Sequence, residues 1–195
     1  MTRLAQIRSE HLPAEWKARF DSASPRDRML MTPTLHAPEL MTALHGLADK
    51  LQEHGTLSGR LVELVRLRIA FHNQCRSCMA MRYPSGLDDG VTEDLVCSLE
   101  RPYDAPDLTE AERAALAYAD ISATDHFAIT DETFAKLREH FTEREIVELG
   151  LQTAYFIGFG RLVAAWDMVE ELPDSFSRNA GVAAPWAAGA FVFGH

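Results

Sequence analysis

The fold of this chain is decided by residues 58–90, which read SGRLVELVRLRIAFHNQCRSCMAMRYPSGLDDG. Apolar side chains recur through residues 59–73 at helical spacing, which predicts a helix with a wide apolar face. A polar break follows, and residues 76–82 predict a short second helix that ends before the next proline. Two of the three cysteines, Cys75 and Cys78, form a Cys-x-x-Cys at the start of this second helix.

The spacing of the two cysteines points to thiol chemistry. Residues three apart on a helix lie on the same face, so the two sulfurs can close a disulfide with little backbone movement. A thiol in the first turn of a helix faces unpaired N–H groups and the positive end of the helix dipole, and both favour the thiolate. On this argument Cys75 is the more acidic thiol, and Arg76 and Arg82 add positive charge nearby. One cysteine can then attack an electrophile while the other resolves the product.

The same stretch resembles the carboxymuconolactone decarboxylase superfamily, and within it the alkylhydroperoxidase D-like branch. The resemblance rests on Glu63 in an E-x11-C-x-x-C pattern, inside the frame ELVRLRIA…N-x-C-x-x-C that is followed by GVTED. It covers roughly residues 35–170. It implies an all-α, alkylhydroperoxidase D-like helical bundle that is oligomeric and that reduces peroxides with its cysteine pair. It further implies that Cys78 attacks, that Cys75 resolves and that Glu63 is the base, so it differs from the dipole argument on the attacking thiol.

The chain departs from the family motif at one position. The motif usually continues C-x-x-C-x-x-x-H, with the histidine in a proton relay, and here that position is Arg82. An arginine cannot act as a base at neutral pH, although it can hold a thiolate or a substrate carboxylate. His72 is a candidate replacement for the relay. His72, Arg82 and Tyr83 are therefore the candidate relay or substrate-binding residues.

Together these features predict a cysteine-dependent thiol-disulfide oxidoreductase, an antioxidant peroxidase that reduces hydroperoxides. Its expected partners are a hydroperoxide or other small-molecule substrate, a thiol reductant and further copies of itself as a homo-oligomer, with no cofactor. One alternative is a carboxymuconolactone decarboxylase-type lactone enzyme, which would use acid–base groups and a carboxylate clamp such as Arg82. Another is a non-catalytic helical oligomer that only senses redox state, which the missing histidine favours. A single Cys-x-x-Cys with His72 supplies fewer than the four ligands of a structural zinc, so we expect no metal.

Length and charge limit the other classes of function. The 195 residues correspond to one domain with tails, and we expect an N-terminal extension at 1–34, the helical domain at 35–172 and an apolar C-terminal tail at 173–195. The net charge of −10 argues against nucleic-acid or anionic-membrane partners. No run approaches the roughly 18–20 apolar residues of a membrane span, and no signal-peptide core is present. The chain is predicted to be cytoplasmic, where a Cys-x-x-Cys is more often redox-active or metal-binding than structural.

The remainder of the chain predicts an otherwise helical protein. Further helices are expected at 14–21, 38–53, 92–100, 109–124, 131–140 and 142–170. Two of them open with capping boxes, at Thr109 and at Thr142, and the longest is apolar on most sides, as in a central or interface helix. Cys97 is expected to be a small buried hydrophobe. In the tail, we expect apolar residues to pack on a neighbouring subunit or on this chain's own surface: Pro185, Trp186, Phe191 and Phe193.

Overall fold

The computed structural model describes residues 2–178, 181–186 and 190–192, and nearly all of its regular structure is helical. The α-helices are α1 (Ala14–Ser22), α2 (Pro25–His36), α3 (Pro38–His54), α4 (Gly59–His72), α5 (Arg76–Ala80), α6 (Pro84–Asp88), α7 (Glu93–Ser98), α8 (Glu110–Thr124), α9 (Asp131–Arg138), α10 (Glu143–Trp166) and α11 (Asp174–Ser177). Two 3-10 turns, η1 (Ser9–His11) and η2 (His126–Ala128), and two short strands, β1 (Met81–Arg82) and β2 (Phe191–Val192), complete the description. None of the described helices combines the length and the apolar character needed to cross a membrane.

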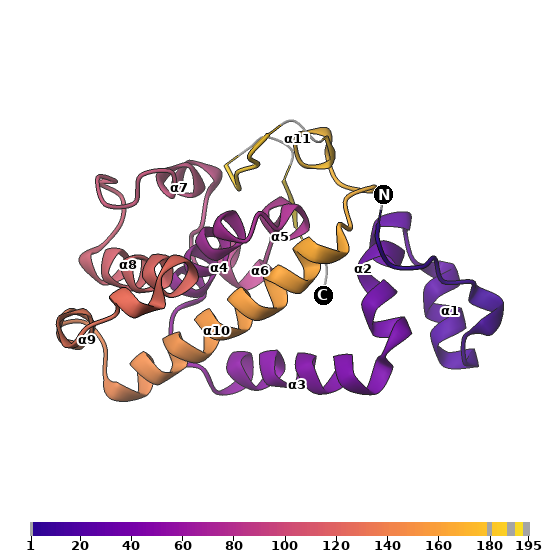
Figure 1. Cartoon of the computed structure of the whole chain (residues 1–195), viewed down its shortest axis with the longest axis horizontal. Coiled ribbons are helices and arrows are strands. Elements are labelled where there is room, and N and C mark those ends of the chain that lie inside the picture. The colour runs from indigo at the N-terminus through magenta and orange to yellow at the C-terminus, as the bar shows by residue number, and fades with distance from the viewer. Residues whose placement is uncertain (1, 179–180, 187–189, 193–195) are drawn as a thin grey trace.

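The helix that carries Glu63 is the centre of the fold, as the sequence predicts. In Figure 1, α4 lies behind the long diagonal helix α10 and beside α8, and it also packs against α5 and α6. Four of its apolar side chains have no exposed surface: Leu64, Val65, Leu67 and Ile69. Because α4 is buried on several sides, the polar groups it carries must find their partners inside the protein.

Both expected capping boxes are present. The side chain of Thr109 accepts the N–H of Glu112 at the start of α8, and that of Thr142 accepts the N–H of Glu145 at the start of α10. α10 then runs for 24 residues along the molecule and ends at Trp166, a few residues earlier than expected. It ends there because Asp167 takes a left-handed conformation, with φ of 54°, which breaks the helical path.

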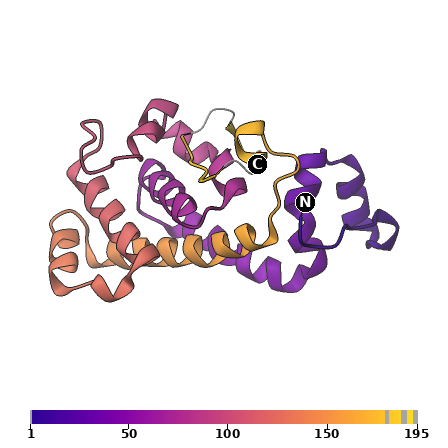
Figure 2. The same ribbon diagram turned by 45° about the horizontal axis from the view of Figure 1, so that its top comes forward.

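The N-terminal extension holds a helix that the sequence analysis missed. A short helix was expected near residue 14 and is present as α1, but α2 follows and continues across the limit expected at residue 34. Pro25 occupies its first turn, where a missing N–H is harmless, and the hydroxyl of Ser24 caps it by accepting the N–H of Asp27. Pro33 lies inside α2. Figures 1 and 2 show α1 and α2 set off at one end of the molecule.

The prediction of a helix at 76–82 is wrong for its last two residues. α5 ends at Ala80, and Met81 and Arg82 form β1, which pairs in parallel with Phe191 and Val192 of the tail. This pairing draws the chain out of the helical path. The described part of the tail therefore covers this chain's own surface, one of the two expected places. Phe193 lies outside the described residues.

The environment of the third cysteine differs from the prediction. Cys97 is exposed and has no disulfide partner among the described residues. The apolar face of α7 is made by Leu95, Val96 and Leu99, all of them buried. The intervening position of a helix then points to solvent, so the prediction that Cys97 is buried is wrong.

Candidate active site

The two cysteines of the Cys-x-x-Cys are joined. Cys75 and Cys78 form a disulfide, with their Cα atoms 5.2 Å apart. Cys75 is the N-cap residue of α5, and its Sγ accepts the N–H of Cys78 at 3.3 Å. Cys75 has no exposed surface, whereas Cys78 is only partly buried. The pair is therefore asymmetric, and Cys78 is the less buried of the two cysteines.

The turn before the pair is held against α10. Asn73 donates from its amide nitrogen to the carbonyls of Phe156, at 3.0 Å, and Ile157, at 3.3 Å. Gly160 makes room for this contact, because a Cβ atom there would lie 2.6 Å from the same amide nitrogen. The next residue, Gln74, adopts a left-handed conformation with φ of 51°, which turns the chain from α4 into α5. At Gly160, α10 is thus approached by a side chain of the loop that precedes the cysteines.

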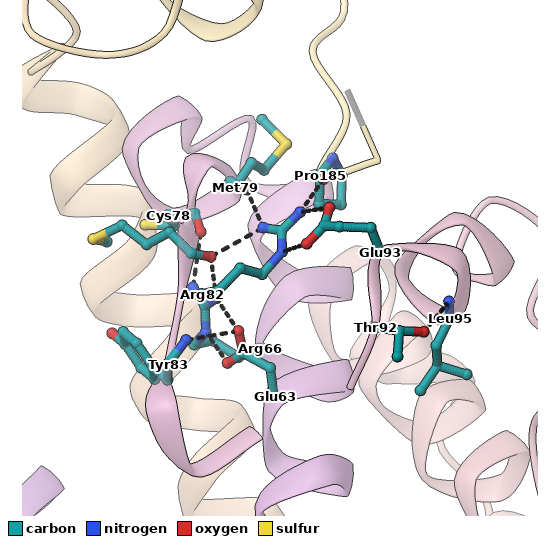
Figure 3. Close-up of polar contacts among 11 residues, drawn as sticks. Glu63, Arg66, Cys78, Met79, Arg82, Tyr83, Thr92, Glu93, Leu95 and Pro185 are labelled. Carbon is teal, nitrogen blue, oxygen red and sulfur yellow. Dashed lines mark hydrogen bonds and ion pairs between the residues drawn. The ribbon is translucent and has the colours of Figure 1, made fainter. Parts of the chain in front are cut away.

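Glu63 lies inside the protein and is paired with a residue that the sequence analysis did not single out. Its carboxylate forms two bonds to the guanidinium of Arg66, from Nε at 2.6 Å and from Nη2 at 2.7 Å, as Figure 3 shows. Glu63 is 1% exposed and Arg66 is 3% exposed. Gly86 closes over the acid, since a Cβ at that position would lie 2.6 Å from the Cβ of Glu63. The carboxylate therefore faces Arg66 rather than solvent.

The Glu63–Arg66 pair is bonded to the backbone around the cysteines (Figure 3). Arg66 donates to the carbonyl oxygens of Cys78 and Met81, each at 2.8 Å, and Glu63 accepts the N–H of Tyr83 at 3.2 Å. Burial disfavours the charged form of Arg66, but the charge and hydrogen bonds of Glu63 outweigh burial and raise the pKa of Arg66. The guanidinium also lies over the ring of Tyr83, 4.2 Å from its centroid. Burial raises the pKa of Tyr83, and the positive charge of Arg66 opposes this only in part.

Arg82, at the motif's histidine position, is 2% exposed and uses every N–H it has. Nε and Nη2 bind the two carboxylate oxygens of Glu93 at 2.8 and 3.0 Å. Nη1 donates to the carbonyls of Met79 and Met81, and Nη2 also donates to that of Pro185 in the tail, at 2.6 Å. An arginine side chain has five N–H donors, and all five are used here. Arg82 would therefore have to release one of these partners to bind a substrate.

His72, the other relay candidate, is hydrogen-bonded to a residue of α8 and not to the cysteines. Its Nε2 lies 2.6 Å from a carboxylate oxygen of Asp120 on α8, which also accepts from Arg68 and from the hydroxyl of Tyr103. Burial disfavours the ionised form of Asp120, but these three hydrogen bonds outweigh it and lower the pKa of Asp120 to about 2. Burial and the bond to Asp120 raise the pKa of Tyr103 to about 12. Within the described residues, no hydrogen bond joins His72 to either sulfur.

The structure thus gathers most of the predicted site residues around α5 and β1. The two cysteines, Glu63, Arg82 and Tyr83 lie there, while His72 belongs to a separate network between α4 and α8. The relay or substrate roles of His72, Arg82 and Tyr83 stay predictions. Arg66 was missed, although its place three residues after Glu63 on one helix was a usable signal for an ion pair.

Comparison with known proteins supports the resemblance. Residues 38–120 match the family model described as the carboxymuconolactone decarboxylase family. The resemblance seen in the sequence is confirmed. The matched segment runs from α3 into α8 and contains both cysteines and the Glu63–Arg66 pair.

The curated relatives are similar to this chain over part of its length. An uncharacterized protein of Mycobacterium tuberculosis strain H37Rv, Rv2313c, is 40% identical over 90 residues, which make up 45% of this chain and 31% of that protein. The chain thus spans about a third of the length of that relative. The uncharacterized protein YdfG of Bacillus subtilis strain 168 is 26% identical over 116 residues, covering 59% of this chain and 78% of YdfG.

Solved structures share the helical fold. An uncharacterized peroxidase-related protein of Ralstonia eutropha JMP134, described as an alkylhydroperoxidase AhpD core, has a TM-score of 0.65 at 20% identity and covers 90% of this chain and 94% of its own. A peroxidase-related protein of Silicibacter sp. TM1040 has a TM-score of 0.66 at 17% identity, with the same coverage. A protein of unknown function from Agrobacterium tumefaciens, ATU0492, suggested to be the antioxidant defence protein AhpD, has a TM-score of 0.60 at 26% identity and covers 68% of this chain and 91% of its own. The all-α, AhpD-like fold is therefore confirmed.

Proposed function

We propose that this protein is a cysteine-dependent thiol-disulfide oxidoreductase that reduces hydroperoxides through Cys75 and Cys78. The observation that carries the proposal is the bonded, asymmetric pair, with Cys78 partly buried and Cys75 fully buried at the N-cap of α5. The family match and the suggested antioxidant role of the A. tumefaciens protein support the same class of activity.

The proposed reaction has three steps. The thiolate of Cys78 attacks the terminal oxygen of a hydroperoxide, the O–O bond breaks, and the alcohol leaves after taking up a proton. The Cys78 sulfenic acid then condenses with the thiol of Cys75, which forms the S–S bond and releases water. An external dithiol reduces the disulfide by thiol–disulfide exchange and is itself oxidised. Per cycle, one hydroperoxide is reduced to an alcohol and water.

The asymmetry of the pair supports Cys78 as the attacking residue. A buried Cys75 cannot meet a peroxide without movement of the loop, whereas Cys78 is partly exposed. The N-cap position of Cys75 favours a different step, the reduction of the disulfide. When a reductant attacks the sulfur of Cys78, Cys75 leaves as a thiolate, and its Sγ already accepts the N–H of Cys78. A leaving thiol of low pKa leaves faster, so the acidity expected of Cys75 favours reduction of the disulfide.

Glu63 is the proposed base, on the resemblance alone. Both of its oxygens are bound to Arg66, and Oε1 also accepts the N–H of Tyr83. A carboxylate has about four lone-pair positions, so one remains for a proton from the site.

The lactone-enzyme alternative finds less support in the geometry. It would use Arg82 as a carboxylate clamp, and all five N–H groups of Arg82 are engaged by protein acceptors. The redox-sensing alternative differs from the enzyme in the rate at which it reacts with peroxide: a sensor would react no faster than a free thiol.

The test is a thiol titration before and after one equivalent of an organic hydroperoxide, followed by stopped-flow kinetics. A Cys97→Ser background removes the exposed third thiol. With both site cysteines present we expect two thiols to be lost per equivalent. Cys75→Ser should stop at a sulfenic acid that dimedone traps, and Cys78→Ser should react no faster than a free thiol. If Cys78→Ser reacts as the parent does, the proposal is wrong; if the parent is as slow as a free thiol, the chain is a sensor.

We also propose that the chain assembles with itself. α3 and α10 leave large apolar side chains in solvent: Leu40 (74% exposed), Leu47 (42%), Val147 (62%), Leu151 (47%) and Leu162 (48%). In Figure 1 α3 lies along the bottom of the molecule and the diagonal helix α10 rises above it, and the two helices are in contact. Large apolar side chains exposed on two helices in contact are a feature of protein interfaces, and soluble oligomers are most often built from identical chains.

A further inference from the structure

Arg66 is bonded to the backbone of the proposed attacking cysteine. α5 has only five residues, so the carbonyls near its C-terminal end have no N–H from a following helical turn. Nη1 of Arg66 binds the carbonyl of Cys78, and Nη2 binds that of Met81, just beyond the helix. Because Arg66 is 3% exposed, solvent is largely excluded from this side of the loop. The position of the Cys78 backbone therefore depends on where the guanidinium is held.

Glu63 holds that guanidinium in place. Its two oxygens bind Nε and Nη2 of Arg66 side by side, which restrains the plane of the group as well as its position. The N–H of Tyr83 supplies a third attachment to the same carboxylate. Gly86 leaves no room between α6 and the acid. The pair is thus a fixed and, as a whole, neutral unit beside Cys78.

We propose that Arg66 is a positioning residue for the cysteine pair, and that its charge, balanced by Glu63, sets the acidity of the Cys78 thiol. The inference rests on the proposed cysteine chemistry and gives Glu63 a role as counter-charge that is separate from its role as base. Its consequence is a pair of opposite effects. Without Arg66, the guanidinium charge is lost, and the negative charge that Glu63 keeps disfavours the thiolate; without the charge of Glu63, the unbalanced guanidinium favours it.

Other ionisable groups lie on the elements around α5 and β1. They are Arg68 and His72 on α4 with their partner Asp120 on α8, Arg82 on β1 with its partner Glu93 on α7, Arg76 on α5, Tyr83 after β1, Tyr155 and Arg161 on α10, and Asp174 on α11. Burial raises the pKa of Tyr83, and it raises that of Tyr155 to about 12, so neither tyrosine gains charge in the range where thiols titrate. All of these groups are identical in the variants compared below, so their effects cancel in the differences.

The experiment follows the thiolate of Cys78 directly. In the full chain with Cys75→Ser and Cys97→Ser, Cys78 is the single cysteine, because the sequence holds three. Its thiolate is then titrated by ultraviolet absorbance in this parent, in Arg66→Met, in Glu63→Gln and in the Glu63→Gln/Arg66→Met double variant. We expect Arg66→Met to raise the apparent pKa of Cys78 by about one unit, which is a tenfold loss of thiolate at a given pH below it. Glu63→Gln should lower it by about as much, and the double variant should lie near the parent.

Loss of fold would not reproduce this pattern, since unfolding moves both single variants toward the same ordinary thiol value. Circular dichroism checks the fold of each variant. Arg66→Lys is the conservative control: it keeps the charge, so the pKa should stay near that of the parent, but it cannot hold both carbonyls. In the chain with Cys75 restored, this variant should therefore close the disulfide more slowly.

The proposal is overturned if the two single variants shift the pKa in the same direction, or if the double variant departs from the parent by a full unit. If a single variant does not fold, the pKa of Cys78 in the double variant and in Arg66→Lys still tests the proposal, because both values should lie near that of the parent. A role of Glu63 as base only would leave the pKa of Cys78 unchanged in Glu63→Gln while slowing the reaction with peroxide. The titration contains no peroxide, so a failure of the proposed peroxidase activity would be recognised separately.

Discussion

Replacing Arg82 by methionine should destabilise the protein strongly, although the residue touches neither sulfur. Methionine fills much of the volume of the arginine stem but donates no hydrogen bond. The carbonyls of Met79 and Pro185 would lose the Arg82 donor, while that of Met81 would keep its bond from Arg66, and Glu93 would lose its ion-pair partner. The variant therefore separates a structural role of Arg82 from the substrate-binding role that its motif position predicts.

The magnitude follows from the burial of each partner. A buried carbonyl left without a donor costs about 1–3 kcal/mol, and removing one member of a buried ion pair costs about 3–5 kcal/mol. The side chain of Glu93 is 59% exposed, so water can replace the arginine there and the acid adds little. We expect Arg82→Met to lower the free energy of unfolding by about 3–5 kcal/mol. For a chain of this size, that corresponds to a fall in Tm on the order of 10 °C.

Urea unfolding followed by circular dichroism measures the change, and calorimetry gives the Tm. Glu93→Gln is the matched control at the same contact and should cost less than about 1 kcal/mol. Arg138→Met is the control for an exposed pair, since Arg138 and its partner Glu143 are 52% and 70% exposed, and it should also be nearly neutral. The reasoning is refuted if Arg82→Met stays within 1 kcal/mol of the wild type, or if Glu93→Gln is equally damaging.

Two further predictions concern acid stability and assembly. The pKa of Asp120 is lowered from 3.8 to about 2 in the folded protein, so this carboxylate contributes stability that is present above about pH 4 and lost as the pH falls toward 2. Asp120→Asn should remove about 2 kcal/mol of this acid-dependent stability, and a slope of unfolding free energy between pH 4 and 2 equal to that of the wild type would contradict the assignment. Replacing Leu47 and Leu151 together by glutamate should reduce the molar mass measured by light scattering while the helical circular dichroism is kept, because both side chains are exposed on α3 and α10. Lys136→Glu on α9 is the control, and an unchanged mass in the double variant would argue against that face as the interface.

Several parts of this protein are determined by short-range signals and could be predicted from the sequence. The helix starts at Thr109 and Thr142 were among them, because a capping box satisfies its N–H groups within four residues. The burial of α4 also followed from its apolar spacing. The closeness of the two sulfurs needed only a spacing of three residues at a helix start. α2 was not predicted, although Pro25 stands in its first turn, where a helix tolerates proline.

What the tertiary structure alone decided is how the buried polar groups are satisfied. Arg82 ends β1 and reaches the carbonyl of Pro185, 103 residues away, and His72 finds its carboxylate on α8, 48 residues away. No local sequence pattern predicts partners so far apart in the chain. Cys97 faces solvent for a related reason, since the core takes only the side of α7 that meets it. A helix fixes which side chains share a face from spacing alone, but a buried charge is stabilised by whichever donors and acceptors the folded chain brings within reach.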